Sequence, residues 1–260
     1  MTLSLLAIDA STDTVHLALS VGAAVRTRAL PAGAQASAVL LPAVQALLAE
    51  AQLALSALDA VAFGRGPGAF TGLRTAAAVA QGLACGIDRP VLALDTLAVV
   101  AESARRAGAP AGCVWAAIDA RMGEIYAAPW QHQADGTWLA LTEVVLYSPA
   151  TLAARLNEAC AADAVPTRPT ALAGNALLVH GAALDEGLGA GPAAAISRWP
   201  QAAPDGEALA ALAQAAWQAG QQIDPALALP LYVRDKVAQT TAERLAARQA
   251  ADAAASGGRP

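Results

Sequence analysis

The chain has few cysteines, and their spacing excludes the structures that cysteines usually build. Cys85, Cys113 and Cys160 are far apart, and none of them belongs to a CxxC pair. A disulfide framework needs paired cysteines, and a structural zinc site needs closely spaced ligands. We therefore expect reduced, partly buried thiols in a cytoplasmic protein.

The sequence also lacks a pattern for a membrane span or a secretion signal. The longest uncharged run, residues 29–49, is interrupted by Pro31, Gly33 and Pro42. A bilayer span needs roughly 20 mostly apolar residues, so none is predicted. The segment MTLSLLAIDAST has no basic region before its apolar stretch and no small-residue cleavage pattern. This stretch is better explained as a buried strand.

Basic residues are too few and too scattered for an isolated nucleic-acid-binding domain. The chain has 16 Lys and Arg against 21 Asp and Glu, and its formal net charge is −5. Phosphate contacts normally require a basic stripe, whereas Arg105 and Arg106 are the only adjacent basic pair. If RNA is involved, we expect another subunit to hold most of it.

Apolar patterns typical of strands and helices alternate along the first half of the chain. Short apolar runs predict strands at residues 3–9, 15–21, 24–30, 58–64, 91–94 and 113–118. Helical spacing predicts helices at residues 37–52, 72–85, 98–106, 150–162 and 207–218. Joints rich in proline and glycine are expected at 166–169, 187–192 and 200–206. This alternation favours an α/β fold with a partly parallel sheet.

One short segment occurs twice. The sequence AIDA at residues 7–10 recurs at residues 117–120, and each copy follows an apolar strand. Each is followed by a polar turn and a second apolar run, at residues 15–19 and 125–128. Two copies of strand, aspartate, turn and strand indicate a duplicated half-fold, with Asp9 and Asp119 in equivalent places.

Residues 64–74, GRGPGAFTGLR, follow a predicted strand and open a predicted helix. Glycines there permit positive φ and close approach of the backbone to another surface. The free N–H groups of a helix start can also hold an anion. No Gly-Lys-Ser/Thr follows, so the loop is not a P-loop. A structural tight turn and a phosphate cradle both remain open.

These residues resemble the GRGPGSFTGLR signature of the bacterial TsaB (YeaZ) family, the partner subunit in threonylcarbamoyladenosine synthesis on tRNA. Other segments agree with that family's pattern in the same order: LAIDAST at 6–12, LLP at 40–42, AIDARMGEIY at 117–126 and LPLYVRD at 229–235. The resemblance covers residues 3 to about 237.

The resemblance implies an actin-like α/β fold of two ribonuclease-H-like lobes. We expect these lobes at residues 1–108 and 109–238, with a flexible tail at 239–260. In active relatives such aspartate-bearing hairpins orient metal-bound phosphates between the lobes. Remnants of such a phosphate site would be Asp9, Ser11, Thr12, Gly66, Gly68 and Asp119.

The resemblance also implies a function and partners. The chain would be a non-catalytic subunit that supports a catalytic TsaD-type paralogue in making N6-threonylcarbamoyladenosine at position 37 of tRNA. A TsaE-type ATPase would join the complex, tRNA would be contacted indirectly, and the chain alone would be able to form a homodimer. No cofactor and no membrane association are expected.

The residues themselves give little support for catalysis. His16, His132 and His180 are far apart, whereas TsaD-like metal binding uses two histidines at i and i+4. No GxSxG occurs, and the family's usual His-Ser and loop Ser are replaced here by Ala36-Ser37 and Ala69. We expect no catalytic or metal-binding residue. The alternative is an actin-like ATPase or small-molecule kinase using Asp9 and Asp119 with magnesium; a glycopeptidase-like hydrolase is a remote third.

The predicted helices at residues 37–52 and 72–85 have wide apolar faces that suit either burial or contact with a partner protein. The resemblance favours a partner, because TsaB subunits pair through their first two helices. We expect the interface at Leu40, Leu41, Val44, Leu47, Ala76, Ala80 and Leu83. On this hypothesis Ala80→Arg would leave the fold intact and abolish association.

Overall fold

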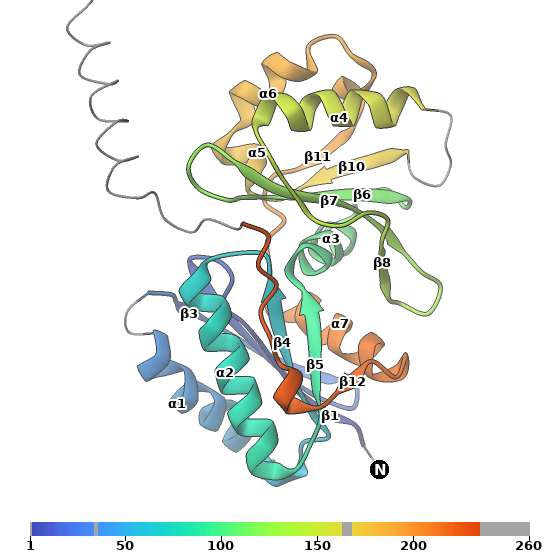
Figure 1. The fold of residues 1–260 in the computed structure, drawn as a ribbon. Helices are drawn as coiled ribbons and strands as arrows, with labels where there is room; N and C mark the ends of the chain where they lie inside the picture. Colours follow the sequence, from blue (N-terminus) through green and yellow to red (C-terminus); the bar gives the residue numbers. More distant parts are fainter. Residues whose placement is uncertain (1, 34–35, 163–167, 235–260) are drawn as a thin grey trace, which may run out of the picture.

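The chain forms two mixed sheets with helices between and outside them (Figure 1). The structure is a computed structural model that describes residues 2–33, 36–162 and 168–234. The tail expected at residues 239–260 lies outside these residues. Within them, no helix is both long and apolar enough to cross a membrane.

The first sheet has the strand order β12-β5-β4-β1-β2-β3. The inner strand β1 is fully buried. The edge strand β3 carries Arg26 and Arg28, and these charges discourage edge-to-edge pairing. The strands are β1 (Ser4–Asp9), β2 (Thr14–Val21), β3 (Ala24–Pro31), β4 (Ala60–Gly66), β5 (Val91–Asp95) and β12 (Gln222–Ile223).

The second sheet repeats this arrangement, in the order β11-β10-β6-β7-β8, with β9 also pairing with β7. Its strands are β6 (Cys113–Asp119), β7 (Ile125–His132), β8 (Trp138–Ala140), β9 (Val145–Tyr147), β10 (Pro169–Ala173) and β11 (Ser197–Trp199). β1 pairs antiparallel with β2 and parallel with β4, and β6 pairs likewise with β7 and β10. The predicted α/β fold with two duplicated lobes is confirmed.

Helices α1 (Ala36–Glu50) and α2 (Phe70–Ile87) share one hydrophobic cluster with the first sheet. On the second sheet, α4 (Pro149–Ala161), α5 (Ala176–Val179) and α6 (Gly181–Leu188) lie over its outer face (Figure 1). Short 3₁₀ helices are η1 (Leu55–Ala57), η2 (Pro192–Ala195) and η3 (Pro225–Leu227).

Helices α3 (Thr96–Arg106) and α7 (Gly206–Gln218) lie between the sheets and share one hydrophobic cluster with residues of both. Although α7 and β12 follow residue 109 in the chain, both are part of the first lobe. β12 is a strand of the first sheet, and α7 packs on β1, β2 and β5 of that sheet. The proposed boundary between residues 108 and 109 therefore does not separate two independent packing units.

The interface residues expected on α1 and α2 are mostly interior. Five of them point to the first sheet and complete its hydrophobic cluster, so a partner cannot reach their side chains in the folded chain: Leu40, Val44, Leu47, Ala76 and Ala80. Leu41 is 44% exposed. Leu83 is half-buried.

Candidate functional site

Asp9 ends β1 and is completely buried. Its Oδ1 accepts hydrogen bonds from the Ser11 backbone N–H at 2.8 Å and the Ser11 hydroxyl at 2.5 Å. The Thr96 hydroxyl donates to Oδ2 at 3.1 Å. A Cβ at Gly64 would lie 1.8 Å from Oδ2. Both oxygens are therefore enclosed and hydrogen-bonded by the chain itself.

Asp119 ends β6 and has the same local geometry. Its Oδ1 accepts the backbone N–H of Arg121 at 3.1 Å, two residues ahead, as Asp9 does with Ser11. His180 Nε2 lies 2.9 Å from the same oxygen, and the Asp119 N–H donates to the Asn175 side-chain oxygen at 2.9 Å. The repeated aspartate turn is thus a structural repeat.

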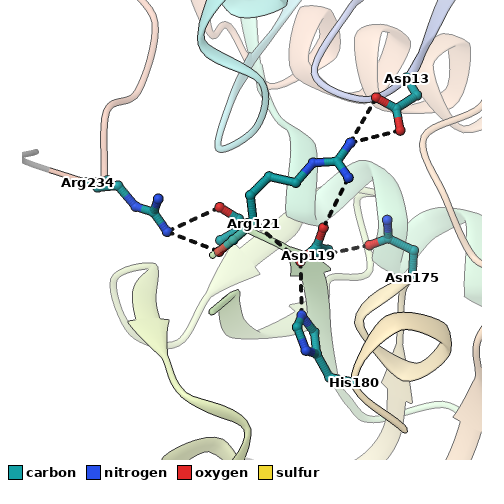
Figure 2. Close-up of polar contacts among 7 residues, drawn as sticks. Asp13, Asp119, Arg121, Asn175, His180 and Arg234 are labelled. Carbon is teal, nitrogen blue, oxygen red and sulfur yellow. Dashed lines mark hydrogen bonds and ion pairs between the residues drawn. The ribbon is translucent and has the colours of Figure 1, made fainter. Parts of the chain in front are cut away.

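Arg121 links the lobes across the mouth of the cleft, as Figure 2 shows. Its NH2 group lies 3.0 and 2.9 Å from the two carboxylate oxygens of Asp13, in the loop between β1 and β2. Its NH1 group is 3.6 Å from Asp119 Oδ2. The Arg121 and Asp13 side chains are 70% and 87% exposed, so solvent screens the pair and it contributes little to stability.

The turn that presents Arg121 has an unusual backbone and is held by a mostly buried arginine. Arg121, Met122 and Gly123 have φ values of 63°, 57° and 77°, in the left-handed region that costs energy for residues with a Cβ. Arg234 supports this turn through its NH2 group, which donates to Ala120 O at 3.1 Å and Glu124 Oε2 at 2.5 Å (Figure 2).

A cavity of about 180 Å³ lies between the two aspartate turns. Of the expected phosphate-site remnants, Ser11, Thr12, Gly68 and Asp119 line it, together with Arg121 and Asn175. Asp9 and Gly66 do not line it. The Thr12 hydroxyl donates to Thr14 O at 3.1 Å, so it is already used within its own loop.

The glycine loop is packed against the first aspartate turn. A Cβ at Gly68 would lie 2.4 Å from Ser11 O, and Ala69 N–H donates to that oxygen at 2.7 Å. Gly66 has φ +113°, but Gly68 is outside the positive-φ region, so its requirement is space. This geometry favours the tight-turn explanation over the phosphate cradle.

The described residues contain no group of three or more His, Cys, Asp or Glu placed to hold a metal ion. His16 faces Asp9 across the β1–β2 ladder, and burial lowers its pKa, although the charges of Asp9 and Asp205 oppose this. His132 lies edge-on to Trp138. The three histidines do not share a site.

Comparison with known proteins agrees with this fold. The structure of YeaZ from Pseudomonas aeruginosa superposes with a TM-score of 0.72 at 36% identity, covering 88% of this chain and 99% of that one. Another P. aeruginosa structure, described as having similarity to peptidase YEAZ, gives 0.74 at 36% identity, covering 89% and 100%. A family model described as "TsaD: tRNA N6-adenosine threonylcarbamoyltransferase" matches residues 31–242. The chain belongs to that family, as a TsaB (YeaZ) member.

Curated TsaB relatives match over a shorter range. The tRNA threonylcarbamoyladenosine biosynthesis protein TsaB of Escherichia coli (strain K12) is 40% identical over 135 residues, 52% of this chain and 58% of that protein. Its counterpart in Haemophilus influenzae is 42% identical over 125 residues, 48% and 52% respectively. The chain thus spans about half the length of the curated TsaB proteins it matches.

Several residues of the cleft in this TsaB member were not identified from the sequence. Asp13, Arg121, Asn175, His180 and Arg234 form its polar network. Arg121 and Arg234 lie within the family-like segments 117–126 and 229–235, which offered the only signal.

Proposed function

We propose that this chain is a non-catalytic partner subunit in the synthesis of N6-threonylcarbamoyladenosine at position 37 of tRNA. The match to YeaZ over 99% of that chain carries this proposal, together with the role of the TsaB relatives in tRNA threonylcarbamoyladenosine biosynthesis. The chain would bind a catalytic TsaD-type paralogue and support its active geometry.

The state of the two aspartates supports a non-catalytic role. A magnesium site needs carboxylate oxygens that are free to coordinate. Three donors occupy the oxygens of Asp9, while Asp119 faces His180 and the Arg121 guanidinium. An ATPase or kinase would first have to break these contacts. Ser11 is a poor peptidase nucleophile, because its hydroxyl is buried and donates to Asp9.

The outward faces of α1 and α2 are the best docking surface for the paralogue. On α2, exposed Ala78, Gly82 and Gly86 form a strip of small residues, and an added Cβ at either glycine meets no atom within 4 Å. On α1, Val39 and Leu41 are 39% and 44% exposed. Small side chains on α2 allow a partner helix to approach closely, and the bound partner would cover the exposed apolar side chains on α1.

The remaining parts of the proposal concern the assembly. A TsaE-type ATPase would join the pair, tRNA would be held mainly by the other subunits, and the same α1–α2 surface would allow homodimers of the isolated chain. The net charge of −5 fits an indirect role in RNA binding. A cytoplasmic location follows from the proposed substrate.

Reconstitution tests the proposal. The chain is mixed with a TsaD-type paralogue, a TsaE-type ATPase and unmodified tRNA, and the modified nucleoside is measured by mass spectrometry. We expect modification only when the chain is present and co-elution of the chain with the paralogue. Full modification without the chain, under the same conditions, would contradict the proposed role.

The ATPase alternative has its own test. The chain alone is incubated with ATP and Mg²⁺, and phosphate release is compared between the native chain and Asp119→Asn, a substitution at the aspartate that lines the 180 Å³ cavity. We expect no turnover from either protein. Turnover by the native chain that Asp119→Asn abolishes would establish the alternative.

A further inference from the structure

Residues 229–234, named here the strap, run from η3 along α2 toward the second sheet (Figure 1). They form no helix or strand, so their position depends on individual contacts. Leu231 N–H donates to Arg65 O at 2.7 Å, which fixes the middle of the strap to the end of β4.

The first anchor of the strap lies on the outer surface of the first lobe. The Tyr232 ring lies 5.3 Å from the Phe70 ring, and the Arg74 guanidinium stacks 3.7 Å above Phe70. Arg74 Nε also donates to the Tyr232 hydroxyl at 2.9 Å. Tyr232 remains 47% exposed, so a molecule that binds the start of α2 can reach this anchor.

The second anchor lies two residues further on and is mostly buried. The Arg234 side chain is 15% exposed and holds the carbonyl of Ala120 and the carboxylate of Glu124. Its NH1 group contacts Met122 Sδ at 3.0 Å. These contacts bind the positive-φ turn at residues 120–124, the segment that projects Arg121 toward Asp13.

We propose that the strap couples the outer surface of α2 to the inter-lobe cleft. Displacing Tyr232 from Phe70 and Arg74 pulls Arg234 from the turn, which then relaxes and releases Arg121 from Asp13. The distance along the chain makes this coupling direct, since one residue separates the two anchors and consecutive Cα atoms are about 3.8 Å apart.

Release of Arg121 would change the shape of the cleft. A second cavity, of about 220 Å³, lies beneath the strap, and it shares part of its wall with the 180 Å³ cavity between the aspartate turns. The shared residues are Gly68, Ala69, Ala120, Arg121 and Tyr126. Movement of the turn at residues 120–124 would therefore alter both cavities together and expose Asp119.

Amide hydrogen exchange by NMR tests this coupling in the chain alone, without any partner. The reporters are the N–H of Leu231 in the strap and those of Ala120 and Glu124 in the turn, which donate to Arg65 O, Glu124 O and Arg121 O. We compare Tyr232→Ala, Tyr232→Phe and Arg234→Gln. Arg28→Gln removes an exposed ion pair with Glu50 elsewhere and serves as the control.

We expect Tyr232→Ala to accelerate exchange about tenfold at Ala120 and Glu124 as well as at Leu231, as local opening becomes easier. Arg234→Gln should do the same in the turn, and Tyr232→Phe should act weakly because the ring contact remains. Arg28→Gln should leave all three amides unchanged.

The proposal is overturned if Tyr232→Ala accelerates exchange at Leu231 alone, since the strap then does not transmit movement. Unchanged turn amides in Arg234→Gln would also overturn it. Should Tyr232→Ala raise exchange throughout the chain, Arg74→Gln replaces it, because Arg74 is an exposed residue outside the strap. These outcomes do not depend on whether the chain binds a TsaD-type protein.

Discussion

Gly68 lies where the glycine loop crosses the first aspartate turn, and it leaves no room for a side chain. The added Cβ of Gly68→Ala would lie 2.4 Å from Ser11 O, a backbone atom that cannot move aside cheaply. We expect a loss of about 1–3 kcal/mol in the free energy of unfolding, measured by urea denaturation. The control is Gly82→Ala, at an exposed helical position with open space, which should stabilise by up to about 1 kcal/mol. Equal effects of the two substitutions would refute the spatial explanation.

The three cysteines differ in reactivity because they differ in exposure. Cys85 is exposed on α2, whereas burial raises the pKa of Cys113 to about 12 and also raises that of Cys160. Only thiolates react readily with maleimide or iodoacetamide. At neutral pH we expect one fast label per folded chain, and none in Cys85→Ser. Rapid labelling of Cys113 in the native protein would show that the second sheet opens.

His16 should make the protein less stable in mild acid. Burial lowers the pKa of His16 in the folded state, so between that value and the ordinary value of about 6.5 the unfolded chain binds more protons. The free energy of unfolding should therefore fall as pH drops below about 6.5. In His16→Gln this decline should be shallower, as measured by urea midpoints from pH 7.5 to 5. Parallel curves for the two proteins would exclude His16 as the cause.

At the scale of elements, α2 has two faces with opposite tolerance for charge. Ala80 is buried against the first sheet, so Ala80→Arg should unfold the chain, which reverses the expectation from sequence. Ala78 is exposed two residues away, so Ala78→Arg should fold normally, as judged by circular dichroism. It should nevertheless lose co-elution with a TsaD-type paralogue, because a long charged side chain prevents close helix packing. Ala183→Arg, at an exposed position on α6, is the control and should still bind. A folded Ala78→Arg protein that binds normally would exclude this face of α2.

Elements with long apolar patterns were predictable, and short ones were not. The six-residue β1 and the helices α3, α4 and α7 follow from periodicity. β8, β9, β11 and β12 have two or three residues each, too few to show a period, and pairing with neighbours creates them. β10 begins at Pro169, which the sequence assigned to a joint. Proline is acceptable there because the first residue of a strand can lack an N–H donor.

The cleft was predictable only in its repeated part. Asp9 and Asp119 were identified because their segments recur in the sequence and both end a strand. His180 contacts Asp119, and Arg234 contacts the turn at 120–124. Both residues are far along the chain from these partners, so only the folded backbone brings them together. Burial on α2 was misjudged because small residues give both faces of a helix a similar apolar pattern, and on α1 because its apolar face suits a sheet as well as a partner.

For the whole molecule, the two sheets are joined by a shared core instead of a free hinge. One hydrophobic cluster contains Leu5 and Ala7 of the first sheet, Val114 and Ala116 of the second, and much of α3 and α7 between them. A cleft movement of the kind proposed for the strap must therefore be local to the α2 edge. Rotation of entire lobes would expose this apolar core to water, at a cost that scales with its area.

The shared core also predicts that the first half of the chain does not fold alone. A fragment of residues 1–108 lacks α7, which packs on β1, β2 and β5, and lacks β12 beside β5. It would also expose the side of α3 that contacts β6 and β7. We expect this fragment to show no cooperative thermal transition by circular dichroism. Co-expression with residues 109–260 should yield a complex that melts cooperatively, and the unfragmented chain provides the reference. A cooperative transition in the isolated 1–108 fragment would instead support an autonomous first lobe and restore the boundary at residue 108.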